Sequence, residues 1–358
     1  MKIEQYPEWL SAFDQIIEEG GVVMMLGAVD TGKTTFSTLL VNRALENGRR
    51  PCVVDADIGQ SEIGPPACVG YGTPIQPIRS LSEVPVTGLE FVGATTPRDV
   101  LLEHVVAVQS AATKVSQVDT DLTIVDTTGL IHGAAARRLK QSKLDILKPR
   151  HIVSLQRKEE CEALLQTLRY RSDFRIHRLS VPSVVTSKSS GFRAQRRTAR
   201  FARAFAESEM RYYGFEDVAF TGTWVNAAAP LAPHFLRFMS NSLKVRVFYA
   251  EECDRHMGIV CGSTPSGESG IALIQEQFRT NAITITPASY LRHLLVGLSD
   301  AGGRMLGIGL IEAVDFRRRQ LGIFTPIRAH AAVRAIQFGL LRVEPSGKEI
   351  GHNRPGDV

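Results

Sequence analysis

Residues 22–34 read Val-Val-Met-Met-Leu-Gly-Ala-Val-Asp-Thr-Gly-Lys-Thr, and this stretch decides the fold. An apolar run ends at Leu26, and the eight residues from Gly27 to Thr34 match the pattern G-x-x-x-x-G-K-[ST] at every fixed position. Apolar residues then recur at helical spacing as far as Asn47. The order of buried strand, glycine-rich turn and helix is the structural context that this pattern requires.

The glycine-rich turn has the chemistry of a phosphate cradle. Its glycines let backbone N–H groups point at phosphate oxygens, and the following helix N-terminus adds a partial positive charge. Lys33 is expected at the β- and γ-phosphates, and the Thr34 hydroxyl is expected on Mg²⁺. The turn therefore predicts a site for ATP or GTP with Mg²⁺. The residues assigned to the nucleotide are Gly27, Asp30, Thr31, Gly32, Lys33, Thr34 and Thr35.

Outward from this turn, short apolar segments alternate with helical segments. This alternation predicts an α/β fold, a P-loop NTPase with a doubly wound parallel sheet covered on both faces. The strands expected are 22–26, 51–56, 90–92, 122–125, 151–155, 178–181 and 219–221, and the helices 5–19, 34–47, 99–114, 133–147 and 158–170.

The pattern changes near residue 230. The segment 226–233 is rich in alanine and proline and is typical of a linker, and short β-rich runs divided by glycine and proline follow it. The expected organisation is an N-terminal helix over 1–20, a P-loop domain over 21–230 and a smaller β-rich domain over 235–358.

Composition excludes several other classes of protein. The 358 residues are 44% hydrophobic and 22% charged, which fits a globular chain and not a disordered one. No apolar run approaches the roughly 18 residues of a membrane span, and the first 20 residues lack the apolar core of a signal peptide. Five cysteines favour a reducing compartment, so we expect a cytoplasmic protein with no membrane partner.

Carboxylates follow two of the predicted strands. Asp55 and Asp57 come after the second strand, and alternation sends both to the phosphate side. One of them can hold the metal or its waters, and the other can accept a proton from an attacking hydroxyl. Asp126 ends another strand and is expected near Mg²⁺. The carboxyl edge of the sheet is thus predicted to carry metal and proton-transfer chemistry.

The basic charge of the chain is local. Lys and Arg outnumber Asp and Glu by 42 to 37, and the segment 188–203 alone holds six basic residues and no acid. Within 188–205 an apolar stripe is expected on one helix face and arginines on another, so this segment predicts an amphipathic lid over the phosphates. The stripe is Ala194, Thr198, Phe201 and Phe205, and the arginines are Arg193, Arg196, Arg197, Arg200 and Arg203.

Four blocks in this order resemble one family. They are residues 27–35, 55–66, 126–156 and 187–205, and the likeness covers roughly 21–215. The chain is similar to the polynucleotide 5′-hydroxyl kinases of the cleavage-factor and pre-rRNA-processing type, including their archaeal relatives. The resemblance implies transfer of the γ-phosphate of ATP or GTP to a 5′-hydroxyl end of RNA or DNA, and it implies no particular protein partner.

The resemblance also implies roles for single residues. Asp57 would be the base that activates the 5′-hydroxyl, and Asp55 and Gln60 would support the metal and the phosphate. Thr127 and Gly129 would belong to a loop that clasps the nucleic-acid end. Leu130 stands where eukaryotic members carry an aromatic residue that can stack on a base. The lid residues implied are Arg193 and Arg197 on the phosphates, with Lys188 where the family often has arginine.

Three other functions stay open at this point. One is a regulatory GTPase, although the chain lacks an N/T-K-x-D guanine motif because 186–190 carries no Asp. The second is a scaffold that binds ATP without turnover in RNA processing. The third is a kinase of small molecules, since the sequence does not reveal the acceptor pocket.

Overall fold

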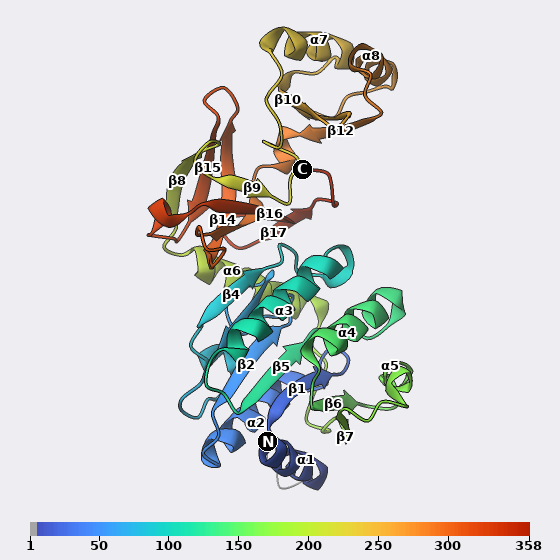
Figure 1. The fold of residues 1–358 in the computed structure, drawn as a ribbon, viewed down its shortest axis with the longest axis vertical. Helices are drawn as coiled ribbons and strands as arrows, with labels where there is room; N and C mark the ends of the chain where they lie inside the picture. The colour runs from blue at the N-terminus through green and yellow to red at the C-terminus, as the bar shows by residue number, and fades with distance from the viewer. Residues whose placement is uncertain (1–5) are drawn as a thin grey trace. The chain divides into compact units, whose positions relative to one another are not determined.

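The computed structural model describes residues 6–358, and the chain divides after Arg200 into two units. The first unit contains the P-loop, and the second begins at Phe201. The first unit has one sheet and the second has two, and each unit has hydrophobic clusters of its own. The units are the blue-to-green and the yellow-to-red parts of Figure 1.

The sheet of the first unit has the strand order β4-β3-β2-β5-β1-β6-β7. Five neighbouring strands run parallel, from β2 through β5, β1 and β6 to β7, and β3 and β4 add an antiparallel edge. This arrangement confirms the predicted P-loop α/β fold, with β5 inserted between β1 and β2. The strands are β1 (Gly21–Leu26), β2 (Pro51–Ala56), β3 (Cys68–Gly72), β4 (Gly88–Phe91), β5 (Leu122–Thr127), β6 (His151–Gln156) and β7 (Arg175–Ser180).

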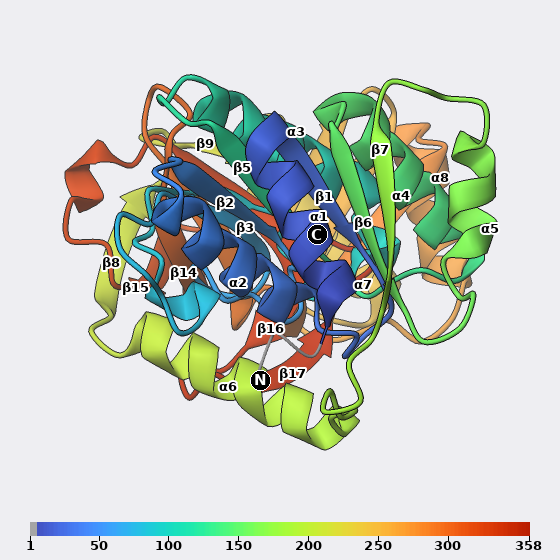
Figure 2. The ribbon, with the colours of Figure 1, turned by 90° about the horizontal axis from the view of Figure 1, so that it is seen from below.

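Helices cover both faces of this sheet (Figures 1 and 2). α1 and α2 pack on the face that buries Val23, Val53 and Ile124, whereas α3 and α4 pack against each other on the opposite face. Right-handed crossovers place α2 and the later α3 and α4 on opposite faces, because the chain reverses its direction of travel along the sheet after β4. The helices are α1 (Pro7–Glu19), α2 (Lys33–Glu46), α3 (Leu101–Ser116), α4 (Gly133–Leu147), α5 (Glu162–Leu165) and α6 (Ser190–Phe205).

The N-terminal helix is part of the core of the first unit. Trp9 and Phe13 of α1 lie against Phe36 of α2, with ring centroids 5.0 and 4.6 Å from it. The indole N–H of Trp9 donates to the carbonyl of Ser180 at the end of β7. These contacts anchor the helix that follows the P-loop, so α1 supports the phosphate site from behind.

In this unit one sequence-based expectation was wrong and one strand was missed. The helix expected over 158–170 shrinks to α5 and a 3₁₀ turn over 166–168. The backbone N–H groups of Arg157 and Lys158 bond to the Glu160 carboxylate, which holds a turn where the helix was expected to begin. The strand β3 was missed because its glycines hide it. They serve close packing, since a Cβ on Gly70 would lie 1.9 Å from the Ile63 carbonyl oxygen.

The second unit begins earlier than the change of pattern near residue 230. β8 (Glu209–Gly214) pairs with β15 (Gln320–Thr325), and β9 (Ala219–Thr221) pairs with β16 (Ala335–Val343), so both belong to the later sheet. Strand pairing between distant segments decides this boundary, and the sequence pattern near 226–233 does not reveal it. The segment 226–233 lies inside the second unit, between β9 and α7.

The second unit has two sheets. The larger has the order β17-β16-β13-β14-β15-β8, and the smaller, β10-β11-β12, packs with α7 and α8 around its own apolar cluster. The remaining elements are α7 (Pro233–Leu243), β10 (Val247–Cys253), β11 (His256–Cys261), α8 (Ser269–Phe278), β12 (Ala282–Pro287), β13 (Leu294–Ser299), β14 (Met305–Asp315), β15 (Gln320–Thr325), β16 (Ala335–Val343) and β17 (Glu349–His352).

Among residues 6–358, none of the helices has the length and apolar character needed to cross a membrane.

Candidate active site

The P-loop forms a cradle at the carboxyl end of β1. Gly27, Asp30 and Gly32 have φ of 151°, 57° and 89°, and a Cβ on Gly27 would lie 2.6 Å from the Leu155 carbonyl oxygen. The Lys33 ammonium is buried and donates to the carbonyls of Gly27 and Ala28 at 3.1 and 2.7 Å. The Lys33 ammonium therefore lies inside the turn that would surround a phosphate.

A hydroxyl and a carboxylate meet beside this cradle. The Thr34 hydroxyl donates to Asp126 Oδ2 at 2.6 Å, joining the start of α2 to β5. Burial raises the pKa of Asp126 to about 6, and the nearby Lys33 ammonium opposes that rise. A hydroxyl and a carboxylate at the edge of a phosphate cradle are the oxygen ligands that Mg²⁺ takes alongside phosphates.

Asp55 organises the loop that follows β2. It is the register partner of Asp126, and both of its oxygens accept hydrogen bonds from the chain just beyond it. Oδ1 accepts from the Asp57 N–H at 3.1 Å, and Oδ2 accepts from the Ile63 N–H at 2.9 Å. Burial, and then the charge of Asp126, raise the pKa of Asp55 to about 8. The sequence suggested that Asp55 supports the metal, but these bonds turn its carboxylate toward the loop.

Asp57 is the half-buried acid of the same loop. Its Oδ1 accepts the backbone N–H groups of Gly59 and Gln60 at 3.1 and 3.0 Å, which fixes the carboxylate and leaves Oδ2 as the oxygen that can take a proton. Asp57 also lies close to the P-loop lysine. Burial lowers the pKa of Lys33, and the carboxylates of Asp126 and Asp57 oppose that shift.

The arginine-rich segment docks on the P-loop. Arg193 Nη1 donates to Asp30 Oδ2 at 3.1 Å, and the backbone N–H of Lys188 reaches the same oxygen at 2.9 Å. Gln60 Nε2 donates to the Arg193 carbonyl at 3.3 Å, which ties α6 to the loop of Asp57. The structure thus brings Arg193 and Gln60 to the rim of the cradle.

The predicted apolar stripe of α6 is buried only in part, since Phe201 and Phe205 are buried and Ala194 is exposed. Arg196 and Arg200 both bind the buried Glu62 carboxylate. Arg200 also donates to the Glu62 carbonyl at 2.8 Å. Residues 193–200 of α6 therefore dock through ion pairs, because Glu62 supplies the acid that segment 188–203 lacks. Sequence reasoning missed Glu62, although it lies within the block 55–66.

Two buried lysines were also missed. Lys140 and Lys143 of α4 are fully buried, and Lys140 Nζ donates to Thr127 Oγ1 and to the Thr128 carbonyl at 2.6 and 2.7 Å. Lys143 Nζ lies 2.9 Å from His104 Nε2. The signal was present in the sequence, since lysines three residues apart lie on the helix face that also carries Leu139, Leu144 and Leu147.

The lysines balance the carboxylates of the site. Burial lowers the pKa of Lys143 to about 7, and Asp57 and Asp55 oppose that shift. Burial also lowers the pKa of Lys140 well below its usual range, with the charges of Lys143 and Lys33 acting in the same direction. Three lysines and three aspartates thus share one buried edge of the sheet, where unpaired charges would be costly.

Lys143→Met is expected to remove part of a pH-dependent stability. Between the folded pKa of about 7 and the usual value of 10.5, the unfolded chain binds a proton that the folded chain has released. Lys143 should therefore add to the wild type a rise in stability from pH 7 to pH 9, on the order of 2 kcal/mol, while the raised pKa of Asp55, about 8, acts in the opposite direction in both proteins. Urea unfolding at both pH values measures the rise. Lys158→Met, at an exposed lysine, is the control, and an equal rise in Lys143→Met and wild type would contradict this assignment.

The remaining predicted residues are divided between the rim and the interior. Gly129 packs on the P-loop, because a Cβ there would lie 2.5 Å from the Val29 N. Thr127 is buried, and its hydroxyl donates to the Met25 carbonyl at 2.7 Å while accepting from Lys140, so it holds the loop after β5 from inside. Thr31 is buried and donates to the Ala28 carbonyl, Thr35 is exposed on α2, and Arg197 is partly buried on α6.

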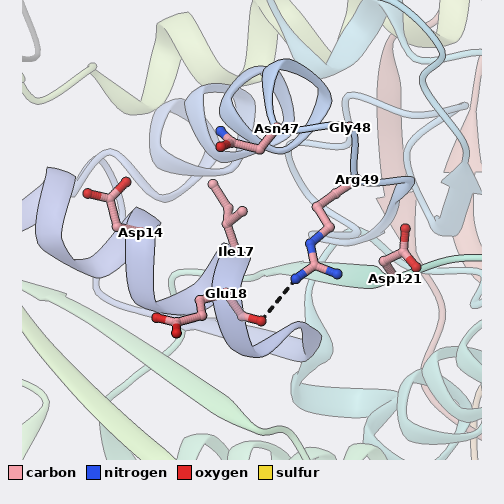
Figure 3. Close-up of a pocket in the computed structure, with 7 residues that line it drawn as sticks. All are labelled: Asp14, Ile17, Glu18, Asn47, Gly48, Arg49 and Asp121. Carbon is pink, nitrogen blue, oxygen red and sulfur yellow. Dashed lines mark hydrogen bonds between the residues drawn. The ribbon is translucent and has the colours of Figure 1, made fainter.

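The first unit also has a cavity that lies away from this site. It has a volume of about 470 Å³ and is lined by the ends of α1 and α2 and by Asp121 before β5 (Figure 3). Arg49 crosses it to donate to the Glu18 carbonyl at 2.9 Å. These residues lie at the amino end of the strands, whereas the P-loop, Asp57 and Asp126 lie at the carboxyl end, where ligands of parallel sheets bind.

The fold and this edge of the sheet define a P-loop nucleotide-binding protein with the acids and arginines of a phosphotransferase. The family model of the mRNA cleavage and polyadenylation factor CLP1 P-loop matches residues 27–207. The chain belongs to this family, which confirms the resemblance.

Relatives and solved structures agree with this placement. The polyribonucleotide 5′-hydroxyl-kinase of Methanocaldococcus jannaschii is 30% identical over 92% of this chain and 89% of its own length. That of Pyrococcus horikoshii is 28% identical over 94% and 89%. A solved structure of Clp1p with Pcf11p superposes with a TM-score of 0.61 at 13% identity, covering 96% of this chain and 80% of that one. This structural likeness shows the shared fold.

Proposed function

We propose that this protein is a polyribonucleotide 5′-hydroxyl kinase that transfers the γ-phosphate of ATP to a 5′-hydroxyl end of RNA. The observation that carries the proposal is the meeting of Lys33, Asp57 and Arg193 at one edge of the first unit. The relatives at about 30% identity carry that activity in their names, and they are matched over most of their length.

The nucleotide and its metal would be held by residues that fit them. The cradle of Gly27–Lys33 has its N–H groups free to face phosphate oxygens, and Thr34 with Asp126 would hold Mg²⁺. Bound Mg²⁺ supplies charge neutralisation across the β- and γ-phosphates. Lys33 would exchange its two carbonyl partners for phosphate oxygens, and Asp55 would keep the Asp57 loop in place.

The chain's own groups divide the transfer between them. Asp57 Oδ2 would accept the proton of the 5′-hydroxyl as its oxygen attacks the γ-phosphorus, while the bond to the β-phosphate oxygen breaks in line. Arg193 would leave Asp30 and meet the negative charge on the transferring group, with Arg197 beside it on α6. Gly129 and the half-buried Leu130, in the loop beside Val29, would border the acceptor end without a stacking ring.

Transfer of labelled phosphate tests this proposal. The full chain with Mg²⁺ and ATP labelled at the γ-phosphate should label a short oligoribonucleotide with a 5′-hydroxyl, and should not label the same oligonucleotide with a 5′-phosphate. Lys33→Ala should abolish the label. Nucleotide hydrolysis or binding without labelled RNA would reject the kinase and favour the ATP-binding scaffold, and labelling of nucleosides alone would favour a small-molecule kinase.

A further inference from the structure

The second unit carries a groove that the phosphate site does not use. Its volume is about 800 Å³, within the range of ligand sites, and it runs between α7, the start of β10, the turn before β13 and the end of β14. Four arginines line it, each from a different one of these segments, and all four are exposed: Arg237, Arg246, Arg292 and Arg317.

Four arginines and two acids line the groove, so its net charge is positive. Glu312 accepts a hydrogen bond at 2.8 Å from His293 Nδ1. Asp315 accepts the backbone N–H groups of Arg317 and Arg318, both at 3.0 Å. The guanidinium groups of Arg237 and Arg292 have no acid partner among residues 6–358. Positive charge contributed by four separate segments favours a chain of phosphates, because successive phosphates can each meet a guanidinium group.

Aromatic faces lie among these charges. The Arg246 guanidinium lies 5.3 Å from the centroid of the Phe248 ring, and Phe316 stacks on Tyr249 with centroids 4.8 Å apart. Both phenylalanines line the groove and stay partly exposed. Single-stranded nucleic acid is bound by this combination, since bases stack on rings and on guanidinium planes while arginines hold the phosphates.

We infer that this groove binds a single-stranded segment of the RNA substrate. The inference rests on the proposed function for the identity of the nucleic acid, but binding itself needs no catalysis. An acidic peptide would match the arginines and leave the ring faces of Phe248 and Phe316 unused, so RNA is the occupant that uses both sets of side chains.

Binding of a 20-nucleotide single-stranded RNA to the full chain tests the groove. Arg246→Ala with Arg292→Ala should weaken binding about tenfold, and should lower the slope of log affinity against log salt by about 1.4, at about 0.7 for each phosphate contact of a single strand. Phe248→Leu should weaken binding about fivefold or more with little change of slope. The control is Arg304→Ala with Arg328→Ala, two exposed arginines of the same unit outside the groove.

The outcomes separate the groove from the kinase. In the transfer reaction, the Arg246 and Arg292 double variant should raise the KM of the 20-nucleotide acceptor and leave that of a dinucleotide unchanged. If the double variant has the same RNA affinity and salt slope as the control pair, the groove does not bind RNA, even if wild type labels RNA. If wild type never labels RNA but the double variant binds RNA more weakly than wild type does, the groove is supported and the kinase is rejected. Unchanged thermal unfolding of the variants excludes misfolding as the cause.

Discussion

Asp57→Asn is expected to slow phosphate transfer by about 10²–10⁴-fold while nucleotide affinity stays near that of wild type. Asparagine keeps an oxygen that can accept the N–H groups of Gly59 and Gln60, so the loop should hold its shape. It lacks the second oxygen that would take the proton of the attacking hydroxyl. The effect should therefore appear in the transfer step and not in binding.

Single-turnover transfer and nucleotide binding measure the two halves of this prediction. The matched control is Asp99→Asn, at an exposed acid of the first unit that the transfer does not use. A transfer rate in Asp57→Asn within a few-fold of wild type would exclude Asp57 as the base. A parallel loss of nucleotide affinity would assign it to the nucleotide instead.

Arg193→Ala is expected to reduce the transfer rate about a thousandfold, with a much smaller change in nucleotide affinity. The guanidinium already lies at the cradle, bound to Asp30 of the P-loop at 3.1 Å. When it leaves Asp30 for the γ-phosphate, its planar fork would meet charge that spreads during transfer. Loss of this side chain should thus raise the free-energy barrier to phosphate transfer more than it weakens nucleotide binding.

Arg203→Ala is the control for this prediction, because Arg203 belongs to the same helix, is exposed and lies beyond the part that docks on the P-loop. It should transfer phosphate at the wild-type rate. Equal losses of rate and nucleotide affinity in Arg193→Ala would mean that the arginine only holds the nucleotide, and the lid would then be a clamp.

Local pattern was sufficient for the sheet and the cradle. The run 22–34 dictates strand, turn and helix, because the apolar residues need burial and Gly27 and Gly32 allow the φ values that an inward-facing loop requires. The acids after β2 and at the end of β5 followed from strand alternation. Residues close in sequence determined all of these features, which is why they could be predicted.

Only the tertiary structure decided how charge is distributed around the cradle. Glu62 receives the arginines of α6 from across 134 and 138 residues of chain, and Lys140 and Lys143 of α4 turn inward beneath the carboxylates. The pairing of β8 with β15, another contact between distant segments, places β8 in the second unit. The sequence determined which charged side chains follow the end of each strand. Which acid meets which base depends on packing between distant segments, because electrostatic pairing acts through space and carries no signature in local spacing.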